Sequence, residues 1–174
     1  MPVQTETNAV IEVIVTHFLE ASMESQGYIR DPFGIDPLGS LIGVLKKLET
    51  PTSQWDKICA FVLKRTTGCS YFYFTSILAS ISPYVSIKMR EEIVARFVKY
   101  GNVDMVFHIT TRQLFRHPSQ QEVLTMAQHH QKKWAPINTK VWVSLISIAD
   151  KDTVGEIKKL MTKVDEHERE PDFF

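Results

Sequence analysis

Histidine and cysteine are the residues of this chain best able to bind a metal ion or act as nucleophiles. The chain has six histidines and two cysteines. His129 and His130 are adjacent, so on a helix their side chains diverge by about 100° and do not converge on one metal ion. Cys59 and Cys69 have nine residues between them, which is not the spacing of a common metal motif. We therefore expect solvated histidines and buried free thiols, with no metal and no cofactor.

The motifs of common catalytic sites are also missing from the sequence. The segment from Gly39 to Gly43 lacks the Lys-Ser/Thr ending of a phosphate-binding loop, and no Gly-x-Ser-x-Gly elbow is present. The paired carboxylates Glu91 and Glu92, like Glu166 and Glu168 on either side of a histidine, are typical of solvated helix faces. The sequence therefore predicts a protein that is not an enzyme.

Composition narrows the class of protein further. The chain has 174 residues, 44% of them hydrophobic, which suits one domain or a short repeat array and excludes a disordered chain. Its formal charge is +0, whereas a nucleic-acid binder usually carries an excess of basic residues. The longest apolar runs, residues 13–15 and 72–74, are far too short to cross a membrane. We expect no direct membrane insertion.

Helical spacing of apolar residues recurs along nearly the whole chain and must position any functional surface. Short turn-forming segments separate the stripes, which predicts an all-α fold of about seven to nine helices in antiparallel pairs. A β-branched run at residues 13–16 leaves a strand open there. The expected apolar faces are Val10, Ile14 and Phe18; Leu41, Val44, Leu45 and Leu48; Trp55, Ile58, Phe61 and Val62; Tyr71, Phe74, Thr75 and Leu78; Ile93, Val94, Phe97 and Val98; Val103, Val106, Phe107 and Leu114; Val123, Leu124 and Ala127; Trp142, Leu145, Ile146 and Ala149; and Val154, Ile157, Met161 and Val164.

Two of the predicted hairpins can be superimposed along the sequence. Ile58-Cys59 aligns with Ile93-Val94 (93 − 58 = 35), and the same shift brings the turn at Gly68 close to that at Gly101. A third copy begins at Leu145-Ile146, displaced by about one extra helix between residues 119 and 133. The sequence therefore indicates helix-hairpin repeats, of which the third is displaced.

The segment from Glu91 to Leu114 resembles a pentatricopeptide (PPR) repeat. The family has an apolar pair in the first helix, a Lys-x-Gly turn and a Val-Asp-x-Ala-like start of the second helix, and here these are Ile93-Val94, residues 99–101 and residues 103–106. Val106 replaces the usual small alanine. Residues 141–164 are similar but lack the turn glycine, and residues 55–81 match less well.

This resemblance implies a short right-handed solenoid of stacked hairpins. We expect an N-terminal helical region over residues 1–50 and two PPR-like hairpins over residues 51–116. Residues 117–174 are expected to hold an extra helix, a third degenerate hairpin and a polar tail, all within one compact domain.

PPR arrays usually bind single-stranded RNA in organelles, one base for each repeat. The resemblance places the base-selecting residues at Asp56, Glu91 and Val143, with Ser86 and Gln121 as closing residues. Two carboxylates repel phosphates and a valine offers no hydrogen bond. Few repeats and no net charge also disfavour tight RNA binding. We therefore expect these positions to have lost the RNA-reading role.

Several aromatic residues are candidates for contact with a protein partner. Residues 71–74 are aromatic all round one predicted helix, so Phe72 and Tyr73 lie either in the core or against a partner. Phe173 and Phe174 end a polar tail, where they could anchor it to another protein.

Two classes of function agree with these features. The first is a structural or adaptor subunit of a large mitochondrial assembly. A PPR-like chain of this size resembles the accessory subunits of the catalytic head of the euglenozoan mitochondrial ATP synthase, which contact its α subunit. The second is an organellar RNA-binding protein for RNA processing, editing or the mitoribosome. The first ten residues are not rich in arginine, so a mitochondrial location implies a mature form without its presequence.

Overall fold

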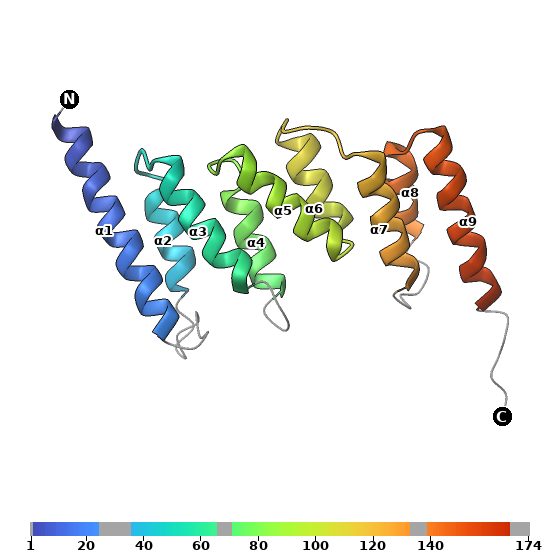
Figure 1. Ribbon diagram of the computed structural model, residues 1–174, viewed down its shortest axis with the longest axis horizontal. Coiled ribbons are helices and arrows are strands. Elements are labelled where there is room, and N and C mark those ends of the chain that lie inside the picture. Colours follow the sequence, from blue (N-terminus) through green and yellow to red (C-terminus); the bar gives the residue numbers. More distant parts are fainter. Residues whose placement is uncertain (1, 25–35, 66–70, 133–138, 168–174) are drawn as a thin grey trace. The chain divides into compact units, whose positions relative to one another are not determined.

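The computed structural model is built entirely from helices in the part of the chain that it describes, residues 2–24, 36–65, 71–132 and 139–167. These residues form nine α-helices and one π-helix and contain no β-strand (Figure 1). The predicted all-α fold is confirmed, and the strand left open at residues 13–16 is replaced by helix. The stacking of the hairpins as a solenoid stays a prediction.

The helices follow the chain in an order that the apolar stripes predicted. They are α1 (Pro2–Glu24), α2 (Pro37–Leu45), α3 (Thr52–Arg65), α4 (Tyr71–Ile81), α5 (Ile87–Lys99), α6 (Val103–Phe107), the π-helix η2 (His108–Arg112), α7 (Gln120–Lys132), α8 (Thr139–Ile148) and α9 (Lys151–His167). Helix α5 begins 35 residues after α3 (87 − 52 = 35), which agrees with the predicted offset between the first two hairpins.

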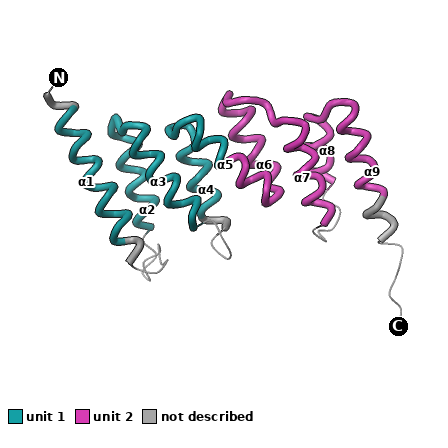
Figure 2. The backbone as a smooth tube through the Cα atoms, viewed as in Figure 1, with its two compact units in different colours: residues 1–93 teal, residues 94–174 magenta. Residues whose placement is uncertain are grey.

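The chain divides into two compact units, Met1–Ile93 and Val94–Phe174, which Figure 2 shows in different colours. The division falls within α5 and coincides with neither of the boundaries expected after residues 50 and 116. Those boundaries stay predictions.

In the first unit, α3 is the central helix because both α1 and α4 pack against it. Its predicted apolar face is buried, with Trp55, Ile58 and Val62 each 2% exposed or less. The indole of Trp55 also stacks on the ring of Tyr84, with ring centroids 5.0 Å apart. This stacking ties α3 to the turn that follows α4.

In the second unit, α7 is the central helix, because α8 and α9 both pack against it. Val123, Met126 and Ala127 of α7 are fully buried, as are Leu145 of α8 and Ile157 of α9. Helix α9 packs principally against α7, which differs from the predicted pairing of α8 with α9 beside an extra helix. Helices α3, α5, α7 and α9 begin at Thr52, Ile87, Gln120 and Lys151, offsets of 35, 33 and 31 residues (87 − 52, 120 − 87, 151 − 120). The predicted extra helix and third hairpin stay predictions.

Three of the predicted apolar faces are wrong in part. On α1, Ile11 and Val15 are fully buried, whereas the predicted Val10 and Ile14 are 57% and 41% exposed. On the helix after Gly101, Leu114 was expected inward with Val103 and Val106, but it is 92% exposed. On the α2 face, the predicted Val44 is 53% exposed, and Leu48, which lies beyond the end of α2, is 38% exposed. Helix α1 is apolar on two sides, and the helix after Gly101 changes its winding before it reaches Leu114.

Candidate interaction surfaces

Two of the residues placed at RNA-reading positions are bonded to each other. The backbone N–H of Ser86 donates to Oδ1 of Asp56 at 2.8 Å. The Ser86 hydroxyl accepts from the backbone N–H of Met89 at 3.3 Å and so caps the start of α5. The side-chain oxygens that base recognition would use therefore take part in holding the turn between α4 and α5.

The same turn is held a second time from α5. Arg90 donates from Nε to the carbonyl of Ser82 at 2.8 Å and from Nη2 to the carbonyl of Pro83 at 2.9 Å. Those carbonyls lie just after α4, where a helix end leaves acceptors without an intrahelical donor. Asp56 thus accepts from a backbone N–H of this turn, and Arg90 donates to two of its backbone carbonyls.

The second unit repeats this arrangement with a different side chain. The backbone N–H of Asp150 donates to Oε1 of Gln120 at 2.8 Å, and Nε2 of Gln120 donates to the carbonyl of Ile148 at 3.2 Å. The separation along the chain, 30 residues, is the same as between Asp56 and Ser86. Asp150 then caps α9 by accepting from the N–H of Thr153, which lowers the pKa of its carboxyl. The Gln120 side chain of α7 therefore makes two hydrogen bonds to the turn that precedes α9.

The remaining RNA-reading positions are not part of these bonds. Glu91 and Gln121 are exposed, and Val143 is 61% exposed on α8. Gln120, one residue before the predicted Gln121, is the one that bonds the following turn. Of the five positions, the structure brings together Asp56 and Ser86.

The predicted aromatic contacts lie outside the described residues. Phe173 and Phe174 belong to the last seven residues, and the side chains of Phe72 and Tyr73, at the start of α4, are likewise outside what the structure describes.

An apolar stripe on the outer side of α1 is the largest group of exposed hydrophobic residues on one described helix. Val10, Val13 and Ile14 are 57%, 58% and 41% exposed, at the spacing of one helix face. The opposite side of α1 packs against α3, where Nζ of Lys57 lies 2.9 Å from Oε1 of Glu12. We call Val10, Val13 and Ile14 the α1 outer face.

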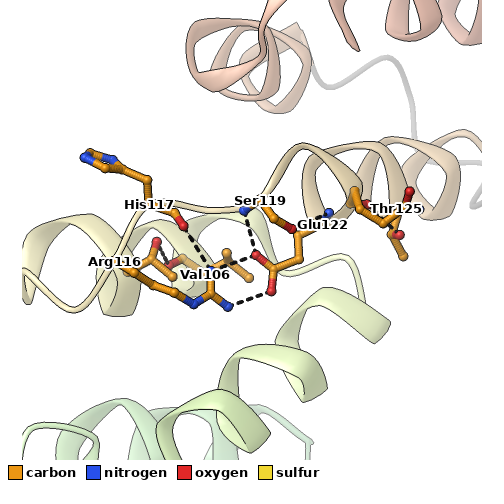
Figure 3. A network of polar contacts seen from close by, with 8 residues as sticks. Val106, Arg116, His117, Ser119, Glu122 and Thr125 are labelled. Carbon is orange, nitrogen blue, oxygen red and sulfur yellow. Dashed lines mark hydrogen bonds and ion pairs between the residues drawn. The ribbon is translucent and has the colours of Figure 1, made fainter. Parts of the chain in front are cut away.

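A polar network fixes the segment that leads into α7 (Figure 3). The Arg116 guanidinium donates to both carboxylate oxygens of Glu122 at 2.8 and 2.7 Å, and to the carbonyl of His117 at 3.0 Å. Ser119 and Glu122 exchange hydrogen bonds in a capping box, N–H to carboxylate at 2.9 Å and N–H to hydroxyl at 3.2 Å. Burial alone would raise the pKa of Glu122, but its bonds to Arg116 and Ser119 outweigh burial and hold that pKa below its usual value.

A groove of about 420 Å³ lies between the second half of α5 and α7. Its lining includes the apolar Ala95 and Val98, the cations Lys99 and Lys132, and the Glu122 carboxylate. Its lining residues are Ala95, Val98, Lys99, Glu122, Thr125, Gln128, His129 and Lys132. Gly101 is required nearby, because a Cβ there would run into the His129 ring. An anion in this groove would meet two attractive lysine side chains and one repulsive carboxylate.

The described residues offer no assembled metal site, since no three His, Cys, Asp or Glu side chains in them are placed to hold an ion. Cys59 is a buried free thiol, and burial, with the nearby Asp56 and Glu92 charges, raises its pKa to about 12. It therefore stays protonated and weakly nucleophilic at neutral pH. In the part of the chain that is described, no helix is long and apolar enough to span a bilayer.

The sequence missed two surface features. The α1 outer face was hidden because apolar residues on both sides of α1 fit more than one helical stripe. Leu114 was assigned inward because nothing in its spacing signals a change of helix type.

Comparison of the chain with protein-family models, with curated proteins and with solved structures finds no match.

Proposed function

We propose that this chain is a non-enzymatic structural or adaptor subunit that docks onto a protein of a large mitochondrial assembly. The best candidate is the catalytic head of mitochondrial ATP synthase, with its α subunit as the contacted protein. The candidate rests on the PPR-like residues around Gly101 and on the size of the chain.

The observation that carries the docking role is the α1 outer face. Val10, Val13 and Ile14 expose β-branched side chains on a helix whose other side is already buried against α3. Covering such surface contributes roughly 25 cal/mol per Å² of apolar area removed from water. A protein surface can provide that cover, whereas RNA phosphates and riboses cannot. The face therefore favours a protein partner.

The bond between Asp56 and Ser86 supports the same role. In a base-reading array, these two polar groups would point at a nucleotide. Here the carboxylate accepts a backbone N–H and the hydroxyl caps α5. Each group thus already takes part in holding the turn between α4 and α5.

RNA binding in an organelle is the second candidate, and the groove between α5 and α7 favours it. Lys99 and Lys132 could each neutralise a phosphate there. Two such contacts supply only weak, salt-sensitive binding, so we rank this function below docking.

Migration of the tagged chain on native gels of mitochondrial extract tests the proposal. The unmodified chain is expected to migrate with ATP synthase, and Val13→Glu is expected to run free because it places a charge in the α1 outer face. Val143→Glu is the matched control, since it makes the same change at a valine of similar exposure on α8, and it should migrate like the unmodified chain.

Other migration patterns would contradict the proposal. Migration with ribosomes or editing particles, lost in Val143→Glu and kept in Val13→Glu, would favour the RNA-binding function. Recovery of the chain from the cytosol would count against both functions.

A further inference from the structure

Leu114 combines two features that a leucine in a folded protein rarely has. It is 92% exposed, and its backbone φ is 53°, in the left-handed region. It is the only non-glycine residue with a positive φ in the described parts of the chain. A side chain with a Cβ is strained there, and a leucine gains nothing from water, so neither folding nor solubility explains the residue.

In the second unit, helix α5 ends in the same way as η2 but has glycine at the left-handed position. At the end of α5, Asn102 N–H donates to the Phe97 carbonyl at 2.9 Å and Gly101 N–H to the Val98 carbonyl at 3.0 Å. These bonds define a Schellman motif, and Gly101 holds the left-handed position with a φ of 66°. Glycine is the usual residue there because it lacks a Cβ.

The end of η2 repeats these bonds with leucine in the glycine position. Phe115 N–H donates to the Thr110 carbonyl at 3.0 Å and Leu114 N–H to the Thr111 carbonyl at 3.2 Å. The two motifs share their hydrogen bonds and differ in the residue at the left-handed position. A leucine therefore occupies a position where the backbone favours glycine.

The chain on both sides of Leu114 is held firmly. Before it, the hydroxyls of Thr110 and Thr111 donate to the carbonyls of Val106 and Phe107, each at 2.7 Å, in the turn where the helix widens to a π-helix. After it, Arg116 is bonded to Glu122 at the start of α7 (Figure 3). Leu114 is thus presented from a fixed backbone, which lowers the conformational entropy lost when it binds.

We propose that Leu114 is an anchor that inserts into an apolar pocket of a protein partner, and that carboxylates line the rim of that pocket. The charge near Leu114 argues for this rim, because the guanidinium of Arg112, two residues before Leu114, is on an exposed side chain. An RNA partner would gain little from an aliphatic side chain, because single-stranded RNA is bound by aromatic stacking and cations. This inference rests on the proposed docking function and adds a second contact site, separate from the α1 outer face.

Relaxing the backbone while removing the side chain separates binding from folding. Leu114→Gly and Leu114→Asn both suit the left-handed position, so both variants should fold at least as well as the unmodified chain. We expect each to lower the fraction that migrates with the assembly by about tenfold or more, as for other interface anchors. Leu114→Met keeps an apolar side chain and should retain most of the binding.

A photo-crosslinking amino acid at position 114 of the full chain identifies what covers the site, with position 87 as control because Ile87 is 71% exposed elsewhere. The expected result is one crosslinked partner peptide, containing apolar residues and Asp or Glu, from position 114 alone. A crosslink to RNA would overturn the inference.

The remaining outcomes distinguish the two proposals. If the chain joins an assembly and Leu114→Gly joins it equally well, the anchor is wrong while the docking function stands. If the unmodified chain joins no assembly, the docking function and the anchor both fall.

Discussion

The carboxylate of Asp56 accepts a hydrogen bond from the backbone N–H of Ser86 at 2.8 Å, across 30 residues of chain. In the hairpin resemblance these two residues are the ones that would recognise a base. Their bond instead joins one first helix, α3, to the start of the next one, α5. The side-chain oxygens at these positions therefore serve the fold, and this relationship can be tested directly.

Replacing Asp56 should separate its bond from its charge. Asp56→Ala leaves the Ser86 N–H without its acceptor, and we expect the free energy of unfolding to fall by about 1–2 kcal/mol. Asp56→Asn keeps an acceptor oxygen and should recover most of that loss. Urea denaturation monitored by circular dichroism measures both changes. Lys88→Ala, at an exposed position on α5, is the control and should change stability by less than about 0.5 kcal/mol. Equal losses in Asp56→Asn and Asp56→Ala would show that the charge, not the acceptor, matters.

The two Schellman motifs predict stability changes of opposite sign. Leu114→Gly relieves a left-handed strain and should stabilise the chain by about 1 kcal/mol, a rise in Tm of roughly 2–4 °C. Gly101→Ala adds a Cβ at a φ of 66° and against the His129 ring, so it should destabilise by more than about 1 kcal/mol. Thermal unfolding followed by calorimetry tests both. A fall in Tm for Leu114→Gly would mean that the Leu114 side chain is stabilising in the isolated chain.

The Arg116–Glu122 pair predicts how stability changes in acid. The folded-state pKa of Glu122 is lowered, so its stabilising contribution is present above the ordinary carboxyl pKa of 4.5 and is lost as pH falls through the lower folded value. Glu122→Gln cannot lose that contribution. Its stability should therefore decline less than that of the unmodified chain when denaturation is measured from neutral pH to below this range. Parallel declines would contradict the pKa direction.

Cys59 should be protected from thiol reagents for as long as the first unit is folded. Its pKa of about 12 leaves almost no thiolate at neutral pH, and its side chain is fully buried. In a Cys69→Ser background, Ellman's reagent should label Cys59 slowly in buffer and fully in guanidinium chloride. Fast labelling under native conditions would show that α3 opens readily around this residue.

The spacing of apolar residues was sufficient to predict the helices and much of the core. Trp55, Ile58 and Val62 are buried as expected because α1 and α4 both pack against α3. On α1 the same argument failed, since its apolar residues cover two sides and spacing cannot say which side meets α3. The inner side is the one that packs against α3, with Ile11 and Val15 fully buried.

The interaction surfaces were harder to predict than the core, for two physical reasons. Leu114 is turned outward by a π-helix that forms where Thr110 and Thr111 bond back to the preceding turn, and helical spacing assumes an unchanged winding. The Asp56–Ser86 and Gln120–Asp150 bonds join side chains to backbone groups 30 residues away. Such bonds depend on tertiary geometry and leave no local pattern in the sequence.

The Asp56–Ser86 and Gln120–Asp150 bonds differ in which substitutions they tolerate at Asp56 and Gln120. Gln120 donates to the carbonyl of Ile148 and accepts from the N–H of Asp150, so only an amide serves both partners. Glutamate there would set its carboxylate against a carbonyl oxygen. Asp56 only accepts a hydrogen bond from the Ser86 N–H, so asparagine, which also has an acceptor oxygen, should be tolerated at this position. Among homologous chains we therefore expect position 120 to stay glutamine, while position 56 drifts between aspartate and asparagine. Neutral substitution would thus remove the negative charge at position 56 before it replaced the glutamine at position 120.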